Sequence, residues 1–116
     1  MQDTQFHKEL YELMDRYVNR VYDASKKFPK DELFGVTSQL RRAALSVVLN
    51  YIEGYARQRN AVLKNFLETS YGSLKESKYL IDFSFGRKYI NDMEHKELIE
   101  FNDRIGRMLW GIFTKL

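Results

Sequence analysis

Apolar residues along the chain recur at steps of three and four, the spacing that places side chains on one face of an α-helix. The pattern runs through four stretches that are separated by short breaks. Each stretch predicts one helix: residues 4–27, 37–58, 61–86 and about 92–115. Helices of about 20 residues joined by short turns predict an all-α fold, an antiparallel up-down-up-down four-helix bundle. We expect it to occupy residues 1–116 as a single domain.

The breaks carry residues that end and begin helices. Phe28-Pro29 is expected to end the first helix, because the residue before a proline is driven out of the helical backbone region. Pro29 and Gly35 bound a segment that predicts one short helical turn. A short polar side chain can cap a helix by accepting a hydrogen bond from a free backbone N–H. The expected caps of the later helices are Thr37 or Ser38, Asn60, and Asn91 or Asp92.

The second stretch holds the two polar residues that a helix face explains least, Asn50 and Glu53. They lie three apart and so share a face, next to Val47 and Tyr51. One interpretation is a buried polar site with a function. The other is a structural polar pair, since a buried charge without a partner is too costly to keep. In that case Glu53 is held by a tyrosine hydroxyl or by one of the nearby arginines, Arg41, Arg42 and Arg57.

Aromatic residues exceed what one core needs. The chain has eight Tyr, eight Phe and one Trp, and its apolar faces are wider than one seam. Tyrosine and tryptophan are favoured at interfaces, because one end of the side chain is apolar and the other polar. We therefore predict a homo-oligomer. The aromatic residues that one core is not expected to hide together are Tyr11, Tyr22, Tyr51, Tyr55, Tyr79, Phe83 and Trp110.

Positive charge is concentrated in the middle of the chain, although the net charge is only +3. Residues 37–59 carry four basic side chains and one acidic one, and residues 60–88 carry five and three. Such a surface favours an anionic partner. The alternative is an ordinary solvated face. The candidate nucleic-acid contacts are Arg41, Arg42, Arg57, Arg59 and Lys64, of which the last three cluster at the turn between the second and third helices.

Motifs for catalysis or metal binding are missing from the sequence. There is no cysteine, and the two histidines, His7 and His95, are far apart and are interpreted as solvated. Asp92-x-x-His95 occurs once, whereas a di-iron bundle needs two Glu-x-x-His motifs. No serine lies in a G-x-S-x-G context, and no glycine-rich phosphate loop is present. We expect a protein that is not an enzyme and has neither a metal site nor a cofactor.

Hydropathy gives an expectation about location. No apolar run approaches the roughly 20 residues that a membrane-spanning helix needs. The first residues, MQDTQFHKEL, are polar and lack the apolar core of a signal peptide. The expected location is therefore the cytoplasm, with no membrane partner.

The second and third stretches resemble the four-helix-bundle family named after the 23S rRNA intervening sequence, whose members are often labelled S23 ribosomal proteins. The resemblance is carried by FPKDELFGVTSQLRRAALSV over residues 28–47, by N-x-x-E-G-Y-A-R over 50–57, and by F-L-x-x-S-x-G-S-L-x-E over 66–76. The chain departs from the family pattern at Val48, where a proline is typical, and at Leu49 and Ile52, where small residues are typical.

The resemblance implies a ring of four-helix bundles, a homopentamer with a central channel. A related protein is the accessory variability determinant protein of diversity-generating retroelements. That relation implies RNA or DNA binding through basic surface, and a reverse transcriptase or another protein as a further partner. The leading hypothesis is a non-enzymatic oligomeric bundle that binds nucleic acid through the five candidate cations. The alternative is a protein–protein interaction scaffold that has an acidic protein partner and no nucleic-acid role.

Overall fold

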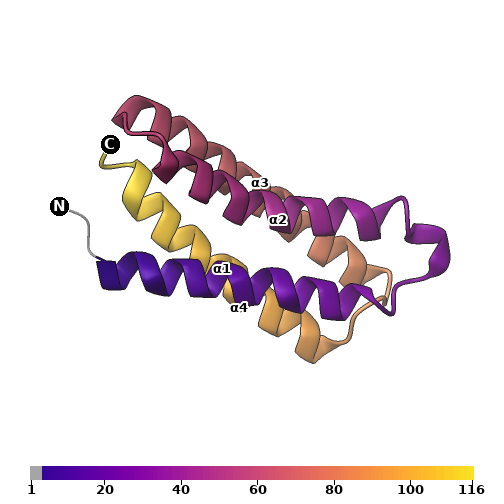
Figure 1. The fold of residues 1–116 in the computed structure, drawn as a ribbon. Helices are drawn as coiled ribbons and strands as arrows, with labels where there is room; N and C mark the ends of the chain where they lie inside the picture. The colour runs from indigo at the N-terminus through magenta and orange to yellow at the C-terminus, as the bar shows by residue number, and fades with distance from the viewer. Residues whose placement is uncertain (1–3) are drawn as a thin grey trace.

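Four α-helices form an antiparallel bundle in the computed structural model, which describes residues 4–116 (Figure 1). The helices are α1 (Thr4–Ser25), α2 (Val36–Ala56), α3 (Asn60–Gly86) and α4 (Asp92–Phe113), and a short 3₁₀ helix, η1 (Lys30–Glu32), lies between α1 and α2. Consecutive helices run in opposite directions, so the all-α bundle predicted from the apolar periodicity is confirmed. No helix of the described residues is long and apolar enough to cross a membrane.

The core follows the apolar seams. In α1 the apolar face is buried from Leu10 through Tyr17 to Ala24, while Phe6 at its start is half-buried. In α4 the buried residues run from Leu98 through Ile105 to Phe113. Burial of apolar surface contributes about 25 cal/mol for each Å² removed from water, so these seams supply the main force that holds the helices together.

The α2–α3 pair packs closely because small residues face each other. A Cβ atom added at Gly54 would lie 3.0 Å from Phe66 Cβ and 3.1 Å from Leu63 Cδ1. Further along the seam, Ser70 Oγ donates a hydrogen bond to the backbone oxygen of Val47 at 2.6 Å. Gly54 therefore allows the close approach that a glycine inside a helix suggests.

Of the three predicted N-terminal caps, the one of α4 is confirmed and those of α2 and α3 are wrong. Asn91 caps α4 as expected: Asn91 Oδ1 accepts from the Glu94 backbone N–H at 2.8 Å, and Glu94 Oε1 accepts from the Asn91 N–H at 2.9 Å. The prediction that Thr37 or Ser38 caps α2 is wrong, because the helix already begins at Val36, whose N–H lies 3.4 Å from Glu32 Oε1. Asn60 is likewise the first residue of α3 and not its cap.

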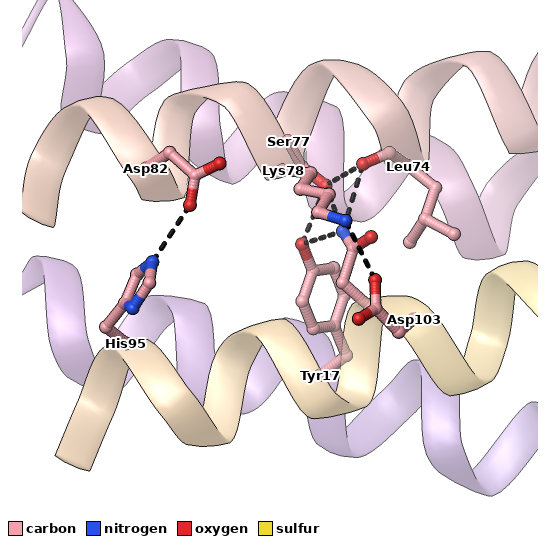
Figure 2. Close-up of polar contacts among 8 residues, drawn as sticks. Tyr17, Leu74, Ser77, Lys78, Asp82, His95 and Asp103 are labelled. Atoms are coloured by element: carbon pink, nitrogen blue, oxygen red, sulfur yellow. Dashed lines mark hydrogen bonds and ion pairs between the residues drawn. The ribbon is translucent and has the colours of Figure 1, made fainter. Parts of the chain in front are cut away.

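Helix α4 is joined to both of its neighbours by ion pairs. Toward α1, Arg20 pairs with Glu97 at 3.3 Å and Arg104 with Glu9 at 2.5 Å. Toward α3, Lys78 Nζ lies 2.9 Å from Asp103 Oδ1 (Figure 2). Between α2 and α3 the described residues form no ion pair. The polar contacts at this seam are hydrogen bonds of serine and asparagine side chains.

Candidate nucleic-acid interface

Three of the five candidate cations gather at the α2–α3 turn. Helix α2 ends at Ala56 and α3 begins at Asn60, so only residues 57–59 connect them. Arg57 and Arg59 lie on this link in extended backbone conformation and are exposed, and Lys64 follows one turn into α3. The short link therefore places three positive charges at one end of the bundle.

The charge of Arg57 is partly compensated. Its Nε donates to Glu53 Oε2 at 2.8 Å, and its guanidinium lies 5.6 Å from the centre of the Phe66 ring. The side chain of Glu53 is 47% exposed, so this i,i+4 pair contributes little to stability, about 0–1 kcal/mol. Within residues 4–116, neither Arg59 nor Lys64 forms an ion pair with a carboxylate. Arg59 and Lys64 therefore carry most of the uncompensated positive charge at the turn.

The other two candidates lie near the opposite end of α2. Arg41 Nε donates to Ser25 Oγ at 2.8 Å and its guanidinium lies 4.7 Å from the centre of the Tyr22 ring, so it joins α2 to α1. Arg42 is exposed and has no ion pair in the described part of the chain. At about 1.5 Å per helical residue, Arg42 is about 22 Å from Arg57. The structure thus divides the five residues into two separate groups.

Asn50 and Glu53 share a helix face but make different contacts. Asn50 Nδ2 donates to the backbone oxygen of Ser46 at 2.8 Å and to Ser46 Oγ at 2.9 Å, and Ser46 Oγ lies 2.8 Å from Ser73 Oγ on α3. Glu53 binds Arg57, one of its expected partners. Asn50 is half-buried and Glu53 is exposed, so the two residues do not form one buried site, and the structural role of the pair stays a prediction.

Both histidines are half-buried and contact neighbouring helices, so they are only partly solvated. His7 Nδ1 lies 2.6 Å from the hydroxyl of Tyr51 on α2. His95 Nε2 lies 2.9 Å from Asp82 Oδ1 on α3 (Figure 2), and its ring stacks on Phe85 at 4.1 Å. Their polar sequence neighbours could not show these partners, which lie on other helices. The described residues contain no group of three or more potential metal ligands.

A buried chain of hydrogen bonds between α1, α3 and α4 was not predicted. Asn102 Nδ2 donates to the Tyr17 hydroxyl at 2.9 Å and to the Leu74 backbone oxygen at 3.0 Å. The Ser77 hydroxyl donates to the same Leu74 oxygen at 2.7 Å, so the Tyr17 hydroxyl donates to Ser77 Oγ, also at 2.7 Å (Figure 2). Burial raises the pKa of Tyr17 to about 12, against the opposite effect of the hydrogen bonds with Ser77 and Asn102.

A groove of about 880 Å³ opens at the end of the bundle that carries the α2–α3 turn. All four helices contribute to its walls. Its apolar lining includes Phe6 from α1, Leu63 from α3 and Ile112 from α4, and Tyr55 contributes an aromatic ring from α2. Asn60, which directly follows Arg59, also lines it. The groove was not predicted from the sequence, and the candidate cations Arg59 and Lys64 are chain neighbours of its lining residues Asn60 and Leu63.

Known proteins are similar to this chain over most of its length. The family model described as 23S rRNA-intervening sequence protein matches residues 7–111. A crystal structure of a protein with unknown function from the S23 ribosomal protein family, from Bacteroides thetaiotaomicron VPI-5482, is similar with a TM-score of 0.83. The two chains are 18% identical, and the match covers 90% of this chain and 97% of that one, a likeness that shows the fold. None of the curated proteins matches.

Proposed function

Because the chain belongs to the 23S rRNA-intervening sequence protein family, we propose that it is a non-enzymatic bundle that binds RNA or DNA through a basic surface and associates with copies of itself. The observation that carries the proposal is the α2–α3 turn. There Arg59 and Lys64 have no carboxylate partner in residues 4–116, and Arg57 lies beside them. Phosphate groups supply the charge that such a cluster lacks.

The second cationic group supports a long ligand. Arg42 lies at the far end of α2, about 22 Å from Arg57 at about 1.5 Å per residue. A mononucleotide cannot contact both groups, whereas a folded RNA can. Binding would be directed mainly to phosphates, since guanidinium and ammonium groups contact the backbone of any sequence. We expect little sequence preference and a steep dependence on salt.

Replacement of two cations tests the proposal. In the double variant Arg59→Gln and Lys64→Gln, we expect weaker binding to a fluorescein-labelled RNA hairpin, measured by fluorescence anisotropy. The slope of log Kd against log salt should shrink by about 1.4–1.8, because each of the two lost phosphate contacts removes about 0.7–0.9 from the number of released counterions.

A charge-matched control separates a local contact from the loss of net charge. The double variant Lys26→Gln and Lys96→Gln removes the same charge from exposed positions at the other end of the bundle. It should keep the slope of the wild type. Equal slopes for both double variants, or no binding by the wild type, would show that the turn is not the interface.

Self-association is supported by apolar side chains that one copy leaves exposed. Leu49 and Ile52 lie one turn apart on α2, and Tyr79 and Phe83 lie one turn apart on α3. Large exposed apolar patches mark contact surfaces more often than chance. The assembly we propose is a ring of five copies.

A protein scaffold is the second candidate function. The observation that favours it is the connection before α2, where Leu33 is half-exposed and Phe34 is 92% exposed, next to Lys30. A protein partner that covers Leu33 and Phe34 would fit this surface, and its acidic character stays a prediction, because Asp31 and Glu32 follow Lys30 in the same turn. A reverse transcriptase as that partner stays a prediction. If a bound protein is retained in the presence of excess unrelated RNA, the scaffold is favoured; if the RNA displaces it, the two compete for one basic surface.

A further inference from the structure

The groove beside the α2–α3 turn has the size of a ligand site. Its volume of about 880 Å³ lies within the range of about 300–1,000 Å³ that is usual for small-ligand pockets. Figure 1 shows the α2–α3 turn, the end of α4 and the start of α1 at one end of the bundle, where the lining residues belong. Phe6, Leu63 and Ile112 make it apolar, and Tyr55 offers an aromatic ring.

Positive charge lines this groove. Arg107 of α4 and Lys115, two residues beyond the end of α4, belong to its lining, and neither has a carboxylate partner within the described chain. Glu9, the acidic residue of the lining, is already bound to Arg104 at 2.5 Å. Arg59 is not a lining residue, but it immediately precedes the lining residue Asn60. The groove is therefore an apolar hollow with two uncompensated cations in its lining and a third next to it along the chain.

We propose that this groove takes an unpaired base of a single-stranded nucleic acid, while the flanking phosphates lie on Arg59, Arg107 and Lys115. The inference rests on the proposed function and assigns its ligand class. A nucleotide is complementary to the site because it joins a flat apolar ring to an anion. Bases in a duplex are stacked and paired, so they cannot enter; in a single strand they can stack on aromatic side chains.

A pair of glycines gives a matched test. Gly111 lines the groove, and a Cβ atom added there would meet nothing within 4 Å, so we expect the larger side chain of Gly111→Leu to occupy part of the groove. Gly72 in α3 is equally open, does not line the groove, and serves as the control in Gly72→Leu. Neither variant changes a charge. Both should fold, because leucine is a better helix former than glycine, and circular dichroism checks this.

Two strands that carry the same charge, one with bases and one without, separate the contribution of the base from that of the phosphates. The full-length protein is titrated with labelled oligouridine of 12 nucleotides and with a strand of 12 abasic sites. We expect the wild type and Gly72→Leu to bind oligouridine about tenfold more tightly than the abasic strand, the scale of stacking of one base. In Gly111→Leu the two strands should bind equally, at the affinity of the abasic strand.

The outcomes separate this inference from the function on which it rests. Equal binding of both strands by the wild type, or an unchanged preference in Gly111→Leu, overturns the base site. The proposed function would survive that result if the RNA hairpin still bound with a steep salt dependence. If neither strand nor the hairpin bound, both proposals would fail. The comparison of the two strands on the wild type needs no variant and decides the inference even if a variant misfolds.

Discussion

Asn102 is the residue through which three helices share one set of hydrogen bonds. Its amide donates to Tyr17 of α1 and to the backbone of Leu74 in α3, and the side chain is almost fully buried. Its Oδ1 has no partner among the described residues. Buried polar groups that lose a partner cost more than the net gain from the bond itself, so the amide should matter for stability.

We expect Asn102→Ala to lower the free energy of unfolding by about 1–3 kcal/mol, because it leaves a hydrogen-bond position on the Tyr17 hydroxyl and one on the Leu74 oxygen unfilled in the core. Urea unfolding followed by circular dichroism measures the change. Asn65→Ala, at an exposed position of α3, is the control and should stay within about 0.5 kcal/mol of the wild type. Equal effects of the two substitutions would contradict a special role for the buried amide.

Tyr17 predicts a loss of stability at alkaline pH. The pKa of Tyr17 is about 12 in the folded protein, against 10.0 for an ordinary tyrosine. Between pH 10 and pH 12 the unfolded chain therefore loses the hydroxyl proton, whereas the folded protein keeps it. The free energy of unfolding should therefore fall as pH rises through this window, by up to about 2–3 kcal/mol from this residue. Urea unfolding at pH 9 and pH 11 measures the first part of the fall, about 1.4 kcal/mol from this residue. In Tyr17→Phe it should be smaller, and an unchanged fall would rule out Tyr17 as its source.

At the scale of elements, the apolar period predicted all four helices, but the local pattern could not show what lies across a seam. Helix α2 begins one residue early because Glu32, which precedes the helix, lies near the first N–H, so Thr37 is not needed as a cap. Asn102 did carry a signal, since it lies four residues after Leu98 and three before Ile105 on the buried face. The partners of His7 and His95 lie on other helices, which no local pattern reveals.

The α2–α3 seam makes a prediction for Gly54. In Gly54→Ala the new methyl group would lie 3.0 Å from Phe66 Cβ, an atom that cannot move without the backbone of α3. We expect the helices to be forced apart and the melting temperature to fall, although alanine is favoured over glycine in a helix by about 1 kcal/mol. Gly72→Ala, which meets nothing within 4 Å, should raise it by a few degrees. Thermal unfolding by circular dichroism would refute the packing argument if both variants were stabilised.

At the scale of the whole molecule, the candidate interface could be predicted only in part. The sequence placed Arg57, Arg59 and Lys64 at one turn, because they are close along the chain. It could not show that Arg41 is engaged with Ser25 and Tyr22, or that four helices leave a groove beside the turn. Contacts between distant parts of the chain exist only after packing, and these decide which cations are free.

The oligomeric state is a property of the whole molecule that can be measured directly. Light scattering of the purified protein should give five times the chain mass of 13.9 kDa. A charge at Leu49, which is 58% exposed, should break the contact, so Leu49→Glu is expected to lower the measured mass while helicity is kept. Asn19→Glu, at an exposed position of α1, is the matched control. If the wild-type protein has the mass of a monomer at micromolar concentration, the proposed ring is wrong.

Both ends of the four-helix path lie at one end of the bundle, since α1 starts and α4 finishes beside the α2–α3 turn (Figure 1). A polypeptide joined closely to the start of α1 or to the end of α4, such as a purification tag or a fluorescent fusion, would lie next to the groove and compete for its space. The opposite end, formed by η1 and residues 87–91, is the place for a label or a surface tether that leaves the groove open.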